Sequence, residues 1–238
     1  MTAPDDTADR LVALEADNAR LRRLLDASGV PENLRHAFRD TVVLLRAIMR
    51  RSAETAEDVE GYLAHLEGRL DALARVRSRT DEYGEADLHT LISDELLFHL
   101  VREGDRASIE GPTVRLRPKA AQVLAMAVHE LASNAVEHGP LARSEGTVTV
   151  AWRLEAGPGD PVLELDWKET GATGLAGPAR RGFGTSVLED MLAYDLKARA
   201  VLAFELDGLH YAARIPMTVR LGRTLETAGD VGELRPVS

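Results

Sequence analysis

The chain has 238 residues, a formal net charge of −10 and no cysteine. The acidic balance argues against nucleic acid or an anionic membrane as the main partner, and the lack of cysteine excludes disulfides and thiolate zinc sites. No apolar run approaches the ~20 residues that span a bilayer, and the acidic first residues lack the features of a signal peptide, so we expect a cytoplasmic protein.

The first segment, residues 1–29, is predicted to be a coiled-coil helix. Leu11, Leu14, Asn18, Leu21 and Leu25 follow one another at spacings of 3, 4, 3 and 4 residues. This spacing is typical of the inward-facing seam of a coiled coil, and an inward Asn fixes the register of a parallel dimer. A solvated helix with leucines at these positions by chance is the alternative.

Residues 30–80 are predicted to form an antiparallel helical hairpin. Apolar residues recur every three or four positions over 32–52 and again over 56–79, after a break at Gly29 and Pro31. Both stripes lie on one side of their helix, and a lone hairpin cannot cover them. We therefore expect two copies to pair as a dimeric four-helix bundle.

Residues 85–220 mix helices and strands, after a predicted linker around 81–85. Helices are expected over 88–101, 119–138 and 185–196, and strands over 147–154, 162–167, 200–206 and 210–215. Asp207-Gly208 between the last two strands is typical of a tight hairpin turn. Helices followed by antiparallel hairpins indicate an α/β sandwich, so the whole chain is of the α+β class. Residues 221–238 have no periodicity and are expected to form a flexible tail.

Two polar residues on the helix over 119–138 suggest a metal site. Glu130 and Asn134 are four residues apart, so they project from the same face of the helix. A carboxylate and an amide oxygen at this spacing suit Mg²⁺ that bridges to phosphates, although a solvated helix face would have the same pattern.

Two later stretches add features that suit a nucleotide. The stretch from Asp166 to Gly171 places carboxylates at a strand end, where one of them can accept a hydrogen bond from an exocyclic amine such as that of adenine. Gly182, Gly184 and Thr185 lead directly into a helix, and backbone amides at such a start bind phosphate. Each stretch alone also fits an ordinary turn or helix cap.

Taken together and in this order, the three stretches resemble the N, G1 and G2 boxes of the GHKL ATP-binding domain. More narrowly, they resemble the HWE family of sensor histidine kinases, because HELASNAVEHG contains His129 and WKETG contains Trp167 and Glu169. The resemblance covers roughly residues 30–217. It implies a Bergerat-type sandwich over 85–220, behind a dimerisation and phosphotransfer hairpin over 30–80.

The resemblance also implies roles for individual residues, with ATP and Mg²⁺ as ligands. Asn134 corresponds to the Mg²⁺ ligand, Glu130 to the acid that positions metal or proton, and Glu169 to the adenine-recognising carboxylate. His129 is expected near the phosphates. The remaining positions implied to contact nucleotide are Trp167, Gly171, Gly182, Gly184 and Thr185.

The resemblance further predicts the phosphoacceptor early in the first hairpin helix, where His36 stands. Asp40, one turn later, is a candidate for accepting a hydrogen bond from the imidazole and orienting it. Ala37, Asp40 and Glu137 depart from the family pattern around the acceptor and the N box.

These features predict a histidine kinase that autophosphorylates from Mg-ATP and passes the phosphoryl group to an aspartate of a response-regulator receiver domain. It would act as a homodimer through the coiled coil and hairpin, with a separate sensor protein as one source of input. An ATP-independent histidine phosphotransfer adaptor is the first alternative, favoured by the altered residues around His36. A GHKL kinase acting on serine is the second, and the long hairpin argues against it.

Overall fold

The computed structural model describes residues 20, 31–55, 58–82, 84–156, 160–171 and 183–224. The chain divides into two compact units, Met1–Arg50 and Arg51–Ser238, and each is described by itself. The predicted coiled coil over 1–29 lies outside the described residues, apart from Arg20, and stays a prediction.

The two long helices predicted for the hairpin are present. Helix α2 (Glu32–Thr55) follows Pro31, and helix α3 (Val59–Ser78) begins after Asp58. The Asp58 side chain accepts a hydrogen bond from the Gly61 amide at 2.8 Å, which satisfies one of the unpaired donors of the first turn. Helix α3 therefore begins three residues later than the apolar spacing predicted. No described helix has both the length and the apolarity to cross a membrane.

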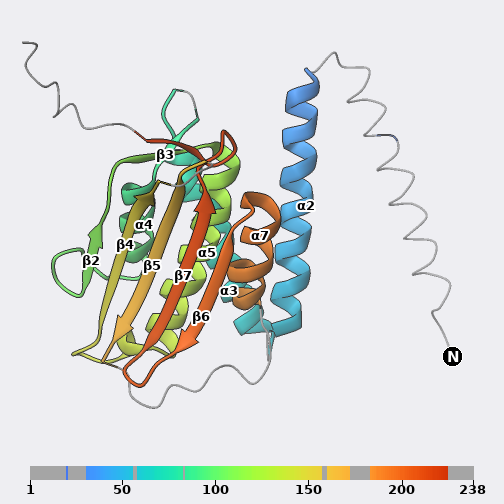
Figure 1. The fold of residues 1–238 in the computed structure, drawn as a ribbon. Helices are drawn as coiled ribbons and strands as arrows, with labels where there is room; N and C mark the ends of the chain where they lie inside the picture. The colour runs from blue at the N-terminus through green and yellow to red at the C-terminus, as the bar shows by residue number, and fades with distance from the viewer. Residues whose placement is uncertain are drawn as a thin grey trace, which may run out of the picture. The chain divides into compact units, whose positions relative to one another are not determined.

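A five-stranded mixed sheet forms the base of the second unit (Figure 1). Its strands lie in the order β2-β4-β5-β7-β6, and only the β2–β4 pair is parallel. The two predicted hairpins supply four of these strands. Their bounds are β4 (Thr147–Glu155), β5 (Val162–Thr170), β6 (Arg199–Phe204) and β7 (Leu209–Pro216), with β2 (Ala107–Glu110) at the other edge.

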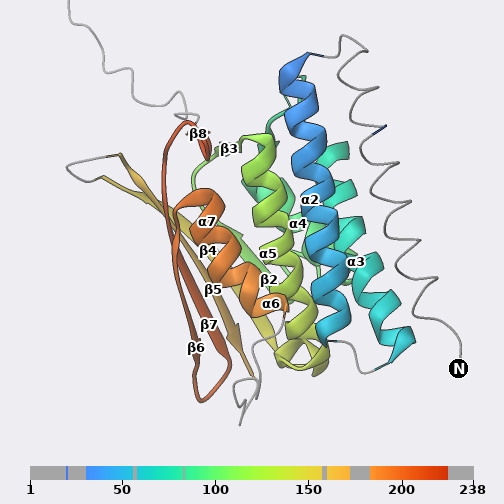
Figure 2. The ribbon, with the colours of Figure 1, turned by 90° about the vertical axis from the view of Figure 1, so that its right-hand side faces the viewer.

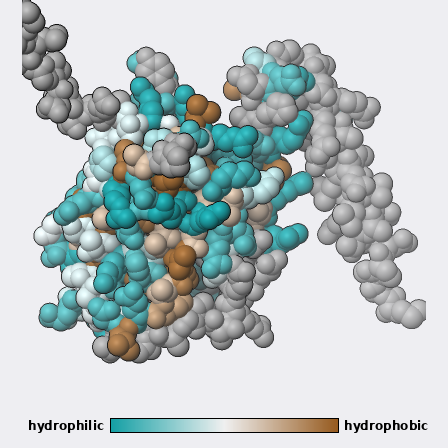
Figure 3. Space-filling view, in the orientation of Figure 1, coloured by the Kyte–Doolittle hydropathy of each residue, from teal (hydrophilic) through white to brown (hydrophobic). Residues whose placement is uncertain are grey.

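Helices cover one face of this sheet, as Figure 2 shows for α4 (Leu88–Phe98), α5 (Pro118–Glu137) and α7 (Leu192–Leu196). Along β4, Val148 and Val150 are buried while Thr147 and Thr149 are exposed, so one side of the sheet faces the helices and the other faces water. The space-filling view from the side of Figure 1 accordingly shows a mainly hydrophilic surface with small hydrophobic spots (Figure 3). The predicted α/β sandwich is confirmed.

A second, three-stranded sheet corrects two of the predicted boundaries. It consists of β1 (Ala86–Asp87), β3 (Val114–Leu116) and β8 (Gly222–Thr224), in the order β1-β3-β8. Residues 221–224, predicted to start a flexible tail, belong to the folded unit instead, because Leu221 is buried and 222–224 pair with β3. The predicted linker ends in Glu85, which is 2% exposed and hydrogen-bonded at 3.0 Å to Arg223.

The helix that leads to β6 contains an irregular segment. It begins as α6 (Phe183–Thr185), passes through the π-helical turn η2 (Ser186–Met191) and continues as α7. The Tyr211 hydroxyl on β7 donates to the Leu188 carbonyl at 3.0 Å, so a buried hydrogen bond ties η2 to the sheet. Single π-helical turns often occur at functional sites. A short 3₁₀ helix, η1 (Pro140–Ala142), follows α5.

The backbone conformation of Leu100, just after α4, can be tested by substitution. It adopts a left-handed conformation with φ of 61° while its side chain is 90% exposed. That conformation costs a non-glycine residue roughly 1–2 kcal/mol. Glycine avoids this cost but loses more conformational freedom on folding, so the substitution recovers only part of it. We predict that Leu100→Gly raises the free energy of unfolding by about 1 kcal/mol and the thermal midpoint by roughly 2–4 °C.

Leu206 provides the matched control, because it is 93% exposed but does not have a positive φ. Leu206→Gly should leave the thermal midpoint unchanged or lower it slightly. Equal changes of the thermal midpoint in the two variants, measured by thermal denaturation, would contradict the left-handed conformation assigned to Leu100.

Candidate functional site

Helix α5 is the element around which the site is built. Proline at its first turn favours the start of the helix, and its alanine-rich sequence favours the interior. It is buried on nearly all sides from Ala120 to Ala132, except at Gln122, because the sheet packs on one side and α3 on another. Its polar residues therefore lie in defined surroundings rather than in bulk water.

The Glu130 carboxylate on α5 is held by an arginine from α3. Arg69 Nε donates to Oε1 at 2.7 Å, and a terminal nitrogen of the same guanidinium donates to Oε2 at 3.1 Å. The other terminal nitrogen donates to the Ser52 hydroxyl at 2.6 Å. Glu130 is 6% exposed, Arg69 4% and Ser52 fully buried, so the carboxylate is part of a buried, charge-assisted network.

Gly184 lies against both predicted metal ligands. A Cβ atom at Gly184 would be 3.1 Å from Glu130 Oε2 and 3.6 Å from Asn134 Nδ2. The absence of a side chain therefore lets the G2 backbone approach Glu130 and Asn134 directly. Thr185, next in the chain, lies in the first turn of this helix and is half-buried. Two stretches about 50 residues apart in sequence thus lie next to each other.

The Glu169 carboxylate on β5 lies beside the C-terminal end of α5. Glu169 is 2% exposed, and a Cβ atom at Gly139 would come within 2.7 Å of its Oε2. Burial raises the pKa of Glu169 to about 7, although hydrogen bonds from the Trp167 indole and the Leu209 backbone amide act to lower it. The Trp167 indole N–H donates to Oε1 at 3.2 Å. A buried acid with a raised pKa is the kind of group that a binding site uses.

Two other predicted positions have different environments. Trp167 is 1% exposed within the sheet–helix core, so it orients Glu169 rather than offering a free surface of its own. Gly171, just after β5, has φ of +99°, a conformation that favours glycine, and lies close to the backbone of Gly146. Gly182 lies outside the described residues.

These positions pass a simple test of fit for a nucleotide with a metal ion. Glycine replaces a side chain at two points where a Cβ would crowd a site carboxylate, at Gly139 beside Glu169 and at Gly184 beside Glu130. Glu130 and Asn134 carry oxygen atoms of the kind that Mg²⁺ prefers, although Arg69 donates to both oxygens of Glu130 in this structure. The described residues therefore offer a metal-binding pair and a buried hydrogen-bond acceptor on either side of the C-terminal half of α5.

The surroundings of His129 differ from the prediction that it lies near phosphates. Its ring is 5% exposed, its Nδ1 lies 2.7 Å from Glu95 Oε1 on α4, and it packs against Gly68 of α3. Burial alone would raise the pKa of Glu95, but hydrogen bonds from His129 and Arg75 lower it further than burial raises it. His129 thus anchors α5 to its neighbouring helices, because consecutive residues on a helix point in different directions.

A second histidine, His99, completes this cluster. Ligand atoms of Glu95, His99 and His129 lie within 4.8 Å of one another, a spacing that a transition metal would accept. Burial and the neighbouring His129 lower the pKa of His99. Arg75 donates to both Glu95 oxygens at 2.7 Å, so the carboxylate charge is already balanced by a buried ion pair.

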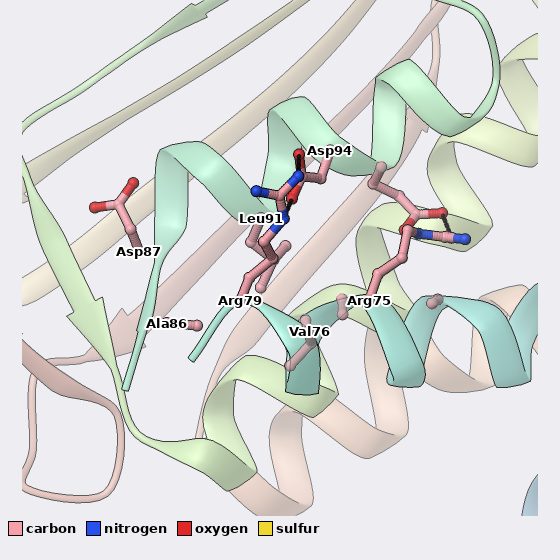
Figure 4. A pocket seen from close by; sticks show the side chains of 10 residues that line it. Arg75, Val76, Arg79, Ala86, Asp87, Leu91 and Asp94 are labelled. Carbon is pink, nitrogen blue, oxygen red and sulfur yellow. Dashed lines mark hydrogen bonds and ion pairs between the residues drawn. The ribbon is translucent and has the colours of Figure 1, made fainter. Parts of the chain in front are cut away.

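A small cavity lies between α3 and α4, and Figure 4 shows Arg75 of α3 and Arg79, just after it, reaching toward α4 there. Arg79 Nε lies 2.9 Å from Asp94 Oδ2. None of the predicted nucleotide residues is among those lining this cavity, so it is distinct from the site along α5.

The predicted phosphoacceptor His36 lies in α2, in the first turns of that helix. Its side chain lies outside the described residues. Asp40, one turn later on α2, is exposed. The orientation of the imidazole by Asp40 stays a prediction.

The sequence analysis missed Arg69 and Glu95. Both are charged residues at positions of an apolar stripe: Arg69 lies three residues after Leu66 and four before Leu73, and Glu95 lies three after Ile92. A charged residue at such a position is the signal that would have identified both as partners of buried charges.

Parts of the chain are similar to known histidine kinases. Residues 33–113 match the family model described as HWE histidine kinase. The blue-light-activated histidine kinase of Brucella ovis is 25% identical over 191 residues, which cover 79% of this chain and 39% of that protein. The blue-light-activated histidine kinase of Brucella anthropi is 25% identical over 207 residues, covering 86% and 42%.

Among solved structures, the histidine kinase domain of the Erythrobacter litoralis EL346 blue-light activated histidine kinase has a TM-score of 0.49 and 16% identity. The match covers 76% of this chain and 85% of that domain. The chain spans about two fifths of the length of the two Brucella relatives.

These sequence matches are to histidine kinases, and the predicted resemblance to the HWE family is confirmed.

The raised pKa of Glu169 predicts how stability depends on pH. The carboxyl group loses its proton near 4.5 in the unfolded chain but near 7 in the folded protein. Between these values the folded state holds the proton more tightly, so stability falls as the pH rises through this window and the loss is complete above 7. Glu169→Gln mimics the protonated acid and should be more stable than wild type by about 1–3 kcal/mol at pH 8, but not at pH 4.5.

Chemical denaturation at both pH values measures this difference. Glu164→Gln is the control, because Glu164 on the same strand is buried but pairs with Arg153 and Arg214, and its loss should destabilise the protein at pH 8. A gain for Glu169→Gln that is the same at both pH values would contradict the assigned shift.

Proposed function

We propose that this chain is a protein-histidine kinase that transfers the γ-phosphoryl group of ATP to His36. The P–O bond to ADP breaks and a P–N bond to the imidazole forms. The observation that carries the proposal is the convergence of Glu130, Asn134 and Gly184 at one point on α5, with Glu169 at the end of the same helix. The family match over residues 33–113 supports it.

Each converging group has a task in this proposal. Asn134 and Glu130 would hold Mg²⁺, which neutralises phosphate charge when bound. The Glu169 carboxylate would accept a hydrogen bond from the adenine amine, and its burial makes that hydrogen bond stronger than it would be in water. The backbone at Gly184 and Thr185 would contact phosphate at the start of the helix. Most of the catalysis would come from positioning and charge neutralisation.

The partners follow from the same proposal. The phosphoryl group would pass from His36 to an aspartate of a response-regulator receiver domain. Two copies of the chain would pair through the predicted coiled coil and hairpin, and input would reach them from a separate sensor protein or an additional domain. We propose that these steps take place in the cytoplasm.

Incubation with labelled Mg-ATP tests the proposed activity. Wild-type protein should acquire label that is stable to base and lost in acid, as expected for phosphohistidine. His36→Ala should carry no label because the acceptor is gone, and Asn134→Ala should carry none because the metal ligand is gone. Label on His36→Ala at the wild-type level would contradict the assigned acceptor, and label stable to acid would favour a serine kinase.

The absence of label from wild-type protein would leave the phosphotransfer adaptor as the alternative. The departures at Ala37 and Asp40 from the family pattern favour that alternative. A nucleotide-binding titration separates the two, because an ATP-independent adaptor would show no Mg²⁺-dependent uptake of ATP.

The role of Asp40 can be tested in the same assay. If its carboxylate orients the imidazole of His36, Asp40→Ala should slow autophosphorylation roughly 10- to 100-fold through loss of alignment while leaving ATP affinity unchanged. Arg39→Ala, at the exposed neighbouring position, is the control for a change in this part of α2. An unchanged rate in Asp40→Ala would exclude the orienting role.

A further inference from the structure

We propose that Arg69 is a further positioning residue of this reaction and that it competes with Mg²⁺ for the Glu130 carboxylate. While α3 is docked on α5, Arg69 holds that carboxylate, and full engagement of Mg²⁺ requires its release. The inference rests on the proposed function, because it takes Glu130 as part of the metal and nucleotide site.

The geometry shows how completely Arg69 engages Glu130. The guanidinium donates to both carboxylate oxygens, at 2.7 Å and 3.1 Å, in the bidentate arrangement that suits arginine and carboxylate. The Ser52 hydroxyl fixes the remaining terminal nitrogen at 2.6 Å. Gly184 lies against Oε2 from another direction. The carboxylate is therefore enclosed by α3 and the G2 backbone.

The positive charge of Arg69 opposes the binding of a metal ion to Glu130 while the two side chains are in contact. The guanidinium keeps its positive charge at every pH at which the protein is folded. A divalent cation at Glu130 would lie within a few ångströms of that charge in surroundings from which water is largely excluded, where like charges repel strongly. Arg69 thus supplies the positive charge beside Glu130 that Mg²⁺ would otherwise supply. By linkage, whatever tightens the contact of α3 with α5 weakens Mg²⁺ binding, and Mg²⁺ weakens the contact by the same factor.

The way in which α3 docks suits a reversible contact. Its buried residues are Arg69, Ala72 and Val76, whereas several of its large apolar side chains remain exposed: Val59 is 73% exposed, Leu63 48% and Leu70 37%. Beside Arg69, the contacts of α3 with α4 and α5 include Gly68 against His129 and the Arg75–Glu95 ion pair. An interface of ion pairs and small residues resembles the polar interfaces between domains that move relative to one another.

A titration of ATP binding against Mg²⁺ concentration tests the proposal. Arg69→Gln removes the charge but retains an amide that can donate to Glu130. The Mg²⁺ concentration at half-maximal ATP binding should fall about tenfold, within the range of roughly 5- to 150-fold that coupled sites show. A purely structural role for Arg69 would weaken binding instead.

Three further variants isolate the interaction. Arg75→Gln removes an arginine from the same helix that pairs with Glu95 instead, and it should leave the Mg²⁺ dependence unchanged. Glu130→Gln should abolish the effect of Arg69→Gln, because the competition acts through that carboxylate. Ser52→Ala, which removes one hydrogen bond of Arg69, should shift the midpoint in the same direction roughly threefold, and it serves if Arg69→Gln does not fold.

The outcomes are distinct. A lower Mg²⁺ requirement in Arg69→Gln or Ser52→Ala, with none in Arg75→Gln, supports the competition. Unchanged Mg²⁺ dependence in folded Arg69→Gln or Ser52→Ala overturns it and leaves the proposed kinase function intact. Failure of every variant and of wild type to bind ATP at any Mg²⁺ concentration overturns the proposed function itself.

Discussion

The structure depends on the burial of α5. This helix lies between the five-stranded sheet and the helices α3 and α4, so almost every side chain from Ala120 to Ala132 is removed from water. A helix in that position can carry a charged residue only with a partner, because an unpaired buried carboxylate costs several kcal/mol. Glu130 meets this requirement through Arg69. The same constraint gives a polar residue of α5 a fixed set of neighbours.

That constraint also explains why His129 and Glu130 have separate tasks. Adjacent on one helix, they point in different directions, so His129 pairs with Glu95 of α4 while Glu130 lies between Arg69 and Gly184. Both arginines that balance these charges, Arg69 and Arg75, come from α3. The hairpin helix α3 is consequently part of the electrostatic environment of the N box, and its position affects the charge available there for a metal ion.

Much of the fold could be predicted from the sequence because it rests on local periodicity. The alternation over β4 specifies that strand over nearly its full length, and the Asp207-Gly208 turn marks the point where β6 and β7 are joined. The short strands β1, β3 and β8 could not be predicted, since two or three residues contain too little periodicity and the pairing of β3 with β8 joins segments over 100 residues apart. The convergence of Glu130, Asn134 and Gly184 followed from the order of the three boxes. The partners of buried charges, Arg69 and Glu95, are tertiary facts that local spacing does not specify.

The central claim is that the C-terminal half of α5, the end of β5 and the start of the helix at Gly184 form one nucleotide site. Hydrogen–deuterium exchange with and without Mg-ATP measures this directly. The account predicts slower exchange of backbone amides at 134–139, 169–171 and 183–186 together, with little change on β2 at the far edge of the sheet. Unchanged exchange at all three segments under saturating Mg-ATP, or protection confined to a different part of the chain, would contradict it.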